Sequence, residues 1–190
     1  MDGFGGGTLI SPNYVLSAAH SFADRNISAS NVVALIGSNY LNRTDGVRIQ
    51  IANILVHPLY NPLVSQLHVF VHDYSILRLS QPAPIAASGG TIGLACLPPL
   101  DGNNYIGTTM LVSGWGLTSC NASFISLALK ATYLTVVPPI VCNYTLRADI
   151  LCAIDQVGTS KTGTGDSGGT IMNFKFIFCQ IKTKNLLQSI

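Results

Sequence analysis

Hydrophobic and polar residues alternate along several short stretches of the chain. The clearest example comprises Val47, Ile49 and Ile51, with polar residues at the two positions between them. A period of two residues is typical of a β-strand that buries one of its faces. Further strands are predicted at 14–18, 32–36, 74–79, 109–113, 129–137 and 149–153. Helical periodicity is scarce, so we expect an all-β chain.

Clusters of Gly, Pro, Asn and Ser separate the predicted strands, and this spacing favours an antiparallel barrel or sandwich. The stretch 81–93 is rich in Pro, Ala, Ser and Gly without periodicity, which is typical of a connection. We therefore predict a single domain over 1–190 with one half at 1–80 and the other at 94–190. Functional residues from both halves would meet in the cleft between them.

Composition narrows the class of protein. The 190 residues are 48% hydrophobic and only 9% charged, with a formal net charge of +2 at pH 7. Such a chain can bury a core, which excludes disorder, and it has no basic cluster that would indicate nucleic acid or an anionic membrane as a partner. No apolar run approaches the roughly 18 residues of a membrane-spanning helix. Residues 1–10 lack the pattern of a signal peptide.

The string GDSGG at 165–169 places a serine between glycines, as in enzymes that present a nucleophilic hydroxyl on a tight bend. A serine hydroxyl is a weak nucleophile at neutral pH and needs a base and an orienting acid. In α/β-hydrolases the histidine follows the serine, but no histidine follows Ser167. His20 and Asp73 both precede Ser167, which is the chymotrypsin order of base, acid and nucleophile.

Further motifs accompany the serine string. They are GGTLI at 6–10 leading into YVLSAAH at 14–20, DYSILRL at 73–79, CLPP at 96–99 and GWG at 114–116. Together and in this order, the motifs resemble the trypsin-like (chymotrypsin-fold) serine peptidase family over residues 4–171. The resemblance implies two antiparallel six-stranded β-barrels, the second of them incomplete, because none of the 23 residues after Ser167 reproduces the family's Ser-Trp-Gly strand.

The resemblance also implies a role for each site residue. Ser167 would be the nucleophile, His20 the general base that later protonates the leaving amine, and Asp73 the group that fixes the imidazole tautomer. The backbone N–H groups of Gly165 and Ser167 would form the oxyanion hole, and Asp166 would organise that loop. No cofactor is implied.

A metal site is the competing interpretation for the other histidines. His57, His68 and His72 lie near Asp73 in the sequence, but their spacing matches no compact zinc motif. We therefore predict no metal. Trp115, between two glycines, indicates a packed turn rather than a ligand platform.

Lys161 lies six residues before Ser167, where the family's specificity pocket has its floor and trypsins carry an aspartate. A lysine there would repel Lys and Arg side chains and favour acidic or small ones. Because Thr162 and Gly163 differ from the family's usual residues, an exposed loop lysine is at least equally expected.

Asp166 is expected to lack its usual partner. In active family members a free N-terminal Ile or Val turns inward, and its ammonium group pairs with this aspartate; no matching segment is present here. An unpaired buried carboxylate is costly enough to distort its surroundings. We therefore predict little or no activity for the chain as it stands.

The five cysteines cannot all pair within the chain. By resemblance, Cys142 and Cys152 form the bridge that precedes the nucleophile loop. Gly5 and Ser21 occupy both positions of the family's bridge beside the catalytic histidine, so that bridge is lost without leaving a free thiol. The other three cysteines have no assigned role: Cys96, Cys120 and Cys179.

These observations predict a secreted serine-type endopeptidase with protein or peptide substrates, and with protease inhibitors as further candidate partners. Secretion is inferred from the family and from four N-glycosylation sequences, which begin at Asn26, Asn42, Asn121 and Asn143. The alternatives are an inactive homologue that acts as a binding or regulatory module, or a gene fragment. A binding module has no physical need for His20, Asp73 and Ser167 together, which favours the enzyme.

Overall fold

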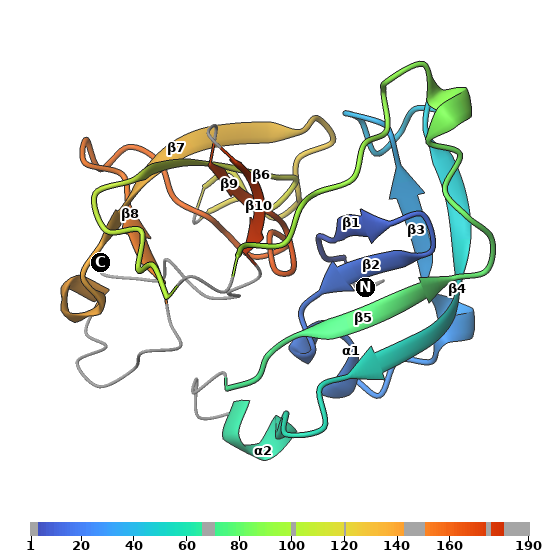
Figure 1. Cartoon of the computed structure of the whole chain (residues 1–190), viewed down its shortest axis with the longest axis horizontal. Helices are drawn as coiled ribbons and strands as arrows, with labels where there is room; N and C mark the ends of the chain where they lie inside the picture. Colours follow the sequence, from blue (N-terminus) through green and yellow to red (C-terminus); the bar gives the residue numbers. More distant parts are fainter. Residues whose placement is uncertain are drawn as a thin grey trace.

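Two antiparallel β-sheets, one from each half of the chain, form the fold (Figure 1). The computed structural model describes residues 4–65, 71–99, 102–119, 121–142, 151–173 and 176–180. In this part of the chain each sheet has five strands, where six per barrel were expected. The predicted all-β class is confirmed, since every helix is a single short turn. None of the described helices is long and apolar enough to cross a membrane.

The first sheet has the strand order β1-β2-β5-β4-β3. Its strands are β1 (Thr8–Ser11), β2 (Tyr14–Ser17), β3 (Val33–Ile36), β4 (Val47–Val56) and β5 (Ser75–Leu79), and the short helices between them are α1 (His20–Ala23), η1 (Ala29–Asn31) and α2 (Pro62–Ser65). The alternation predicted for β4 is confirmed, because Ile49 and Ile51 are buried in the core whereas Arg48 and Gln50 are exposed.

The second sheet has the strand order β10-β9-β6-β7-β8. Its strands are β6 (Thr109–Gly114), β7 (Lys130–Val137), β8 (Cys152–Ile154), β9 (Ile171–Asn173) and β10 (Phe176–Gln180), with the helical turns η2 (Ala86–Ser88) and η3 (Pro139–Cys142) outside the sheet. Met110 of β6 pairs with Leu134 of β7, and both side chains lie in the core of this half.

Most predicted strands coincide with observed ones. The prediction at 149–153 is met only at its end, by β8, and residues 143–150 lie outside the described part. The two sheets are separated by 80–108, in which η2 and one isolated bridge residue are the only regular elements described. The division at 81–93 stays a prediction.

Backbone hydrogen bonds join the two halves at separate places. Tyr40 forms a bridge with Ala128, flanked by a bond from the Leu129 N–H to the Asn39 carbonyl (2.8 Å). The Ala95 N–H donates to the Leu9 carbonyl of β1 at 2.9 Å. Because these contacts come from loops and a strand edge, they fix the two sheets relative to each other without merging their cores.

The predicted disulfide between Cys142 and Cys152 is confirmed. It ties the end of η3 to the start of β8 across ten residues of sequence. Cys96 is a free, exposed thiol. Cys120 and the side chain of Cys179 lie outside the described residues.

Gly5 and Ser21 face each other where the family's lost bridge was predicted. A Cβ atom built on Gly5 would lie 3.9 Å from the Ser21 Cβ and 3.5 Å from the nearest neighbouring atoms. Cβ atoms in disulfides are separated by about 3.5–4.5 Å. The backbone therefore keeps the geometry of a bridge whose sulfur atoms are absent.

Removal of the existing disulfide should destabilise the fold. The Cys142→Ser/Cys152→Ser variant is expected to lose about 2–3 kcal/mol of unfolding free energy, because the bridge closes a loop of about ten residues. Urea denaturation followed by circular dichroism measures the change. Cys96→Ser is the matched control and should leave the midpoint unchanged; equal losses in both variants would contradict the prediction.

Restoring the lost bridge should stabilise the fold. In Gly5→Cys/Ser21→Cys, an oxidised bridge is expected to form without backbone movement and to add about 2–3 kcal/mol, the size predicted for a loop of this length. Thiol titration and thermal melts with and without reductant measure both effects. The two single variants serve as controls, and two persistently titratable thiols in the double variant would show that the geometry is wrong.

Candidate active site

The pairing of β2 with β5 brings His20 and Asp73 together. Ser17, the last residue of β2, is paired with Ser75, the first residue of β5. Because the strands are antiparallel, the chain leaving β2 and the chain entering β5 lie at the same end of the sheet. His20 lies three residues after Ser17, and Asp73 lies two residues before Ser75. The pairing of these two buried serines therefore brings His20 and Asp73 to the same place.

The Asp73 carboxylate binds His20 twice. Its Oδ2 lies 2.7 Å from the His20 Nδ1, and its Oδ1 accepts a hydrogen bond of 2.8 Å from the His20 backbone N–H. The Asp73 side chain is only 2% exposed, whereas the His20 side chain is 23% exposed. A buried carboxylate at Nδ1 holds the proton on that nitrogen and leaves Nε2 as the basic one.

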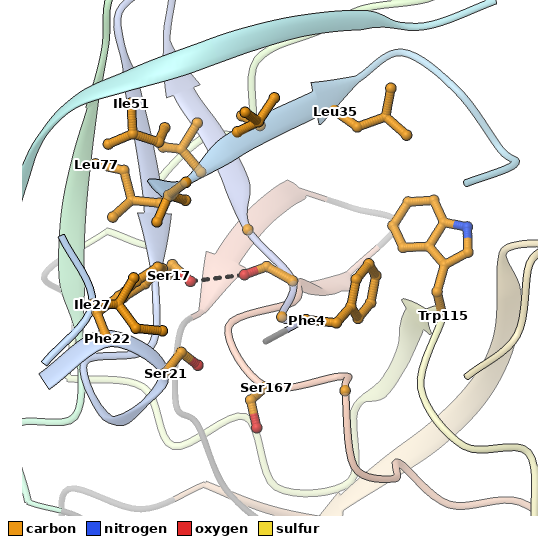
Figure 2. A pocket seen from close by; sticks show the side chains of 18 of the residues that line it. Phe4, Ser17, Ser21, Phe22, Ile27, Leu35, Ile51, Leu77, Trp115 and Ser167 are labelled. Carbon is orange, nitrogen blue, oxygen red and sulfur yellow. Dashed lines mark hydrogen bonds between the residues drawn. The ribbon is translucent and has the colours of Figure 1, made fainter. Parts of the chain in front are cut away.

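The loop that carries Ser167 is held against the first half of the molecule. The Gly6 N–H donates to the Ser167 carbonyl at 2.7 Å. The buried Ser17 hydroxyl donates to the Gly6 carbonyl at 2.7 Å, the contact drawn in Figure 2. The Thr8 and Thr170 hydroxyls also form a hydrogen bond with each other. Thr170, which replaces the family's usual proline, therefore contributes a contact between the halves.

Gly168 is required by the turn after Ser167. Its φ of +81° lies in the left-handed region that favours glycine. An added Cβ would also meet the Gly6 carbonyl oxygen at 2.4 Å and the Ser17 hydroxyl at 2.5 Å. The second glycine of the serine string is thus required by both backbone conformation and close packing.

Two backbone donors satisfy the Asp166 carboxylate. The Gly116 N–H donates to Oδ1 at 2.7 Å, and the Gly163 N–H donates to Oδ2 at 2.8 Å. A Cβ on Gly116 would lie 2.6 Å from the carboxylate carbon, so the aspartate needs a glycine there. Sequence reasoning missed these donors; the glycines around Trp115 were the available signal.

The N–H groups of Gly165 and Ser167 donate no hydrogen bond to any other described residue. The turn around them is closed instead by bonds from the Asp166 N–H to the Gly163 carbonyl (3.1 Å) and from the Gly169 N–H to the Asp166 carbonyl (3.0 Å). This loop therefore leaves two neighbouring donors available for a ligand oxygen.

A cavity of about 970 Å³ connects these groups. Gly165 and Ser167 line it together with His20. Other parts of its wall come from Trp115 and from residues of the first sheet such as Ile51 and Leu77 (Figure 2). Ser167 and His20 thus line one cavity. Their action as a catalytic pair stays a prediction.

Lys161 is exposed and does not line this cavity. It follows a turn in which the Asp155 carboxylate accepts hydrogen bonds from three backbone N–H groups, those of Val157, Thr159 and Ser160. These bonds, that of Val157 foremost, hold the pKa of Asp155 below its usual value. A role for Lys161 in specificity stays a prediction.

Two of the histidines considered as metal ligands, His57 and His72, pack against each other. The His57 and His72 rings stack with centroids 4.8 Å apart, and the Tyr74 ring packs against His57. No group of three or more candidate metal ligands is found among the described residues. His68 lies outside them.

Comparisons with known proteins agree with this geometry. The family model described as Trypsin matches residues 2–177. Brachyurin of Leptuca pugilator is 32% identical over 172 residues, which are 88% of this chain and 70% of that protein. Glucanase inhibitor protein 1 of Phytophthora sojae is 31% identical over 173 residues, which are 90% of this chain and 62% of that protein.

Among solved structures, the chain resembles the scabies mite inactivated protease paralogue S-D1 with a TM-score of 0.77. That match covers 90% of this chain and 72% of the other at 23% identity, so it shows the shared fold alone. The chain spans about two thirds of the length of its curated relatives. With the family model matching nearly all of its residues, the chain belongs to the trypsin family.

Proposed function

We propose that the chain is a serine-type endopeptidase that cleaves peptide bonds through an acyl-enzyme on Ser167. One observation carries the proposal: a buried Asp73 carboxylate 2.7 Å from His20 Nδ1, beside a cavity that Ser167 also lines. Such a carboxylate orients the imidazole and stabilises the imidazolium that forms when it takes the serine proton.

The proposed mechanism is acyl transfer followed by hydrolysis. His20 Nε2 takes the Ser167 hydroxyl proton as Oγ attacks the substrate carbonyl carbon, and the same proton passes to the leaving amine. A water molecule activated by His20 then hydrolyses the ester. The N–H groups of Gly165 and Ser167 would bind the oxyanion, where one lost donor costs about 100-fold to 1000-fold in rate.

Asp166 supports the proposal through its backbone partners. Its two hydrogen bonds from the N–H groups of Gly116 and Gly163 hold the loop that carries Ser167. Hydrogen bonds to a carboxylate contribute about 1.5–3 kcal/mol each. We therefore expect this loop to keep its shape during acylation of Ser167.

A second candidate is a binding module without catalysis. It is favoured by one of the relatives, which is named an inhibitor protein. In that case the cavity would hold a protein segment without cleaving it. The experiment below separates the two functions, because it reports the reactivity of Ser167 independently of any natural substrate.

Secretion remains part of the proposal. Asn26, Asn42 and Asn121, each the acceptor of an N-glycosylation sequence, are all exposed, as glycosylation requires. The disulfide between Cys142 and Cys152 is also typical of proteins that mature in an oxidising compartment.

One test of the proposed function concerns the reactivity of Ser167. A fluorophosphonate probe is expected to label Ser167 in the folded chain, because His20 removes the hydroxyl proton. His20→Ala should reduce the labelling rate by about 1000-fold or more. Gel fluorescence and peptide mapping by mass spectrometry measure rate and site, with Ser167→Ala and urea-unfolded protein as controls. If the folded protein is not labelled, or if His20→Ala is labelled at the same rate, the endopeptidase proposal is rejected and the binding module is favoured.

Another test concerns the role of the Asp166 carboxylate in ordering the loop that carries Ser167. Gly116→Ala is expected to slow labelling of Ser167 by tenfold or more, since the added methyl group must displace the carboxylate that orders the loop. Gly93→Ala is the matched control, because a Cβ there meets nothing within 4 Å. Equal rates in both variants, with thermal melts that confirm folding, would show that Asp166 does not set the loop.

A further inference from the structure

A stacked pair of imidazoles contacts the segment that carries Asp73. The end of β4 lies beside the start of β5 (Figure 1), and this pairing continues past β4, because the His57 N–H donates to the Tyr74 carbonyl at 3.1 Å. The rings of His57 and His72 are nearly parallel, with centroids 4.8 Å apart and planes inclined by 19°. His72 is the residue before Asp73, so the stack is fixed to the backbone on both sides of the aspartate.

The backbone of His72 has a conformation that its surroundings must hold. Its φ of +54° lies in the left-handed region, which is uncommon for residues other than glycine, although histidine is enriched there among them. Such a residue persists only where neighbouring contacts fix it. In the described part of the chain these contacts are the stack on His57 and a hydrogen bond of 2.8 Å from the Tyr74 N–H to the His72 carbonyl. The position of the next residue, Asp73, therefore depends on the stack.

No described carboxylate neutralises the two imidazoles. Neither ring forms an ion pair within the described ranges. The Asp73 carboxylate faces His20, and Asp24 accepts the Tyr60 hydroxyl at 2.7 Å. The phenol of Tyr74 packs against one ring of the pair, and α2, which follows β4 in the chain, contains no titratable side chain. A positive charge on the pair would therefore lack a described counter-ion.

Protonation of both rings opposes the stack. His57 Nδ1 accepts a hydrogen bond of 3.2 Å from the Leu59 N–H, so a proton on this nitrogen has to break that bond. Imidazole is the side chain whose charge changes between pH 5 and 8. Two like charges at stacking distance repel each other. The stacked arrangement is thus compatible with no more than one added proton.

We propose that the stack of His57 and His72 positions Asp73 against His20 and releases it when both stacked rings are protonated. The two histidines are positioning residues that act through Asp73, and the inference rests on the proposed function. Without the stack, His72 leaves its left-handed conformation and the Asp73 carboxylate moves away from His20 Nδ1. The chain then loses activity in acid by a reversible local change.

Two variants of His57 separate positioning from charge at pH 8. His57→Ala removes the ring and is expected to slow labelling of Ser167 by the fluorophosphonate probe about tenfold or more, since a small misplacement of a catalytic group is costly. His57→Phe is the matched control, because it keeps a ring against His72 and should retain the native rate. Thermal melts confirm that both variants are folded. Equal rates for the two variants would show that the stack does not position Asp73.

The pH dependence of labelling tests the release. In the native chain the rate is expected to fall more steeply than about tenfold per pH unit in acid, because protons on the pair add to the one that inactivates His20. His57→Phe cannot take up its proton and should show a slope of about tenfold per pH unit. His72→Asn, which tolerates the left-handed conformation, should combine this shallow slope with a low rate at pH 8. An acid limb shared by the native chain and His57→Phe would overturn the proposal.

Histidine resonances measured by NMR test the pair without catalysis. In the chain with isotope-labelled histidine, His57 and His72 are expected to titrate in two coupled steps, and the His20 resonance should move with the second step. Removal of one ring in His57→Phe should leave a single step for His72. If Ser167 is unlabelled at every pH, the endopeptidase proposal fails while this titration still decides the inference. Independent single-step titrations of the two rings in the native chain would contradict it.

Discussion

The candidate site depends on one backbone hydrogen bond between the halves, from the Gly6 N–H to the Ser167 carbonyl. The Ser17 hydroxyl fixes Gly6 from the other side. Ser17 is also the β2 residue whose pairing with Ser75 sets the positions of His20 and Asp73. The positions of the imidazole, the carboxylate and the serine loop are therefore all set by the end of strand β2. A shift of that strand would move every candidate catalytic group at once.

Backbone donors hold the Asp166 carboxylate in the same loop. A carboxylate among backbone donors is held by dipoles that are already fixed by the fold, so no charged group has to be desolvated with it. The requirement is steric instead, because the carboxylate occupies the space where a Gly116 side chain would be. Gly116 therefore contributes to the order of the serine loop by leaving room for the Asp166 carboxylate.

Local patterns predicted the β-rich fold, whereas the placement of Asp73 beside His20 was implied by the family resemblance. Alternating residues marked β4, and the order of histidine, aspartate and serine limited the chemistry to one arrangement. The donors to Asp166 could not be predicted, since a backbone N–H has no residue type of its own.

The contacts between the halves have a consequence for how the protein loses its site. Each half has a hydrophobic core of its own, whereas the described bonds around Ser167 that cross between them are a few polar contacts. Such an interface can open while both cores stay intact, because the free energy of opening is only a fraction of that of global unfolding. Heating would then separate the serine from the imidazole before either sheet melts, and cooling would reunite them.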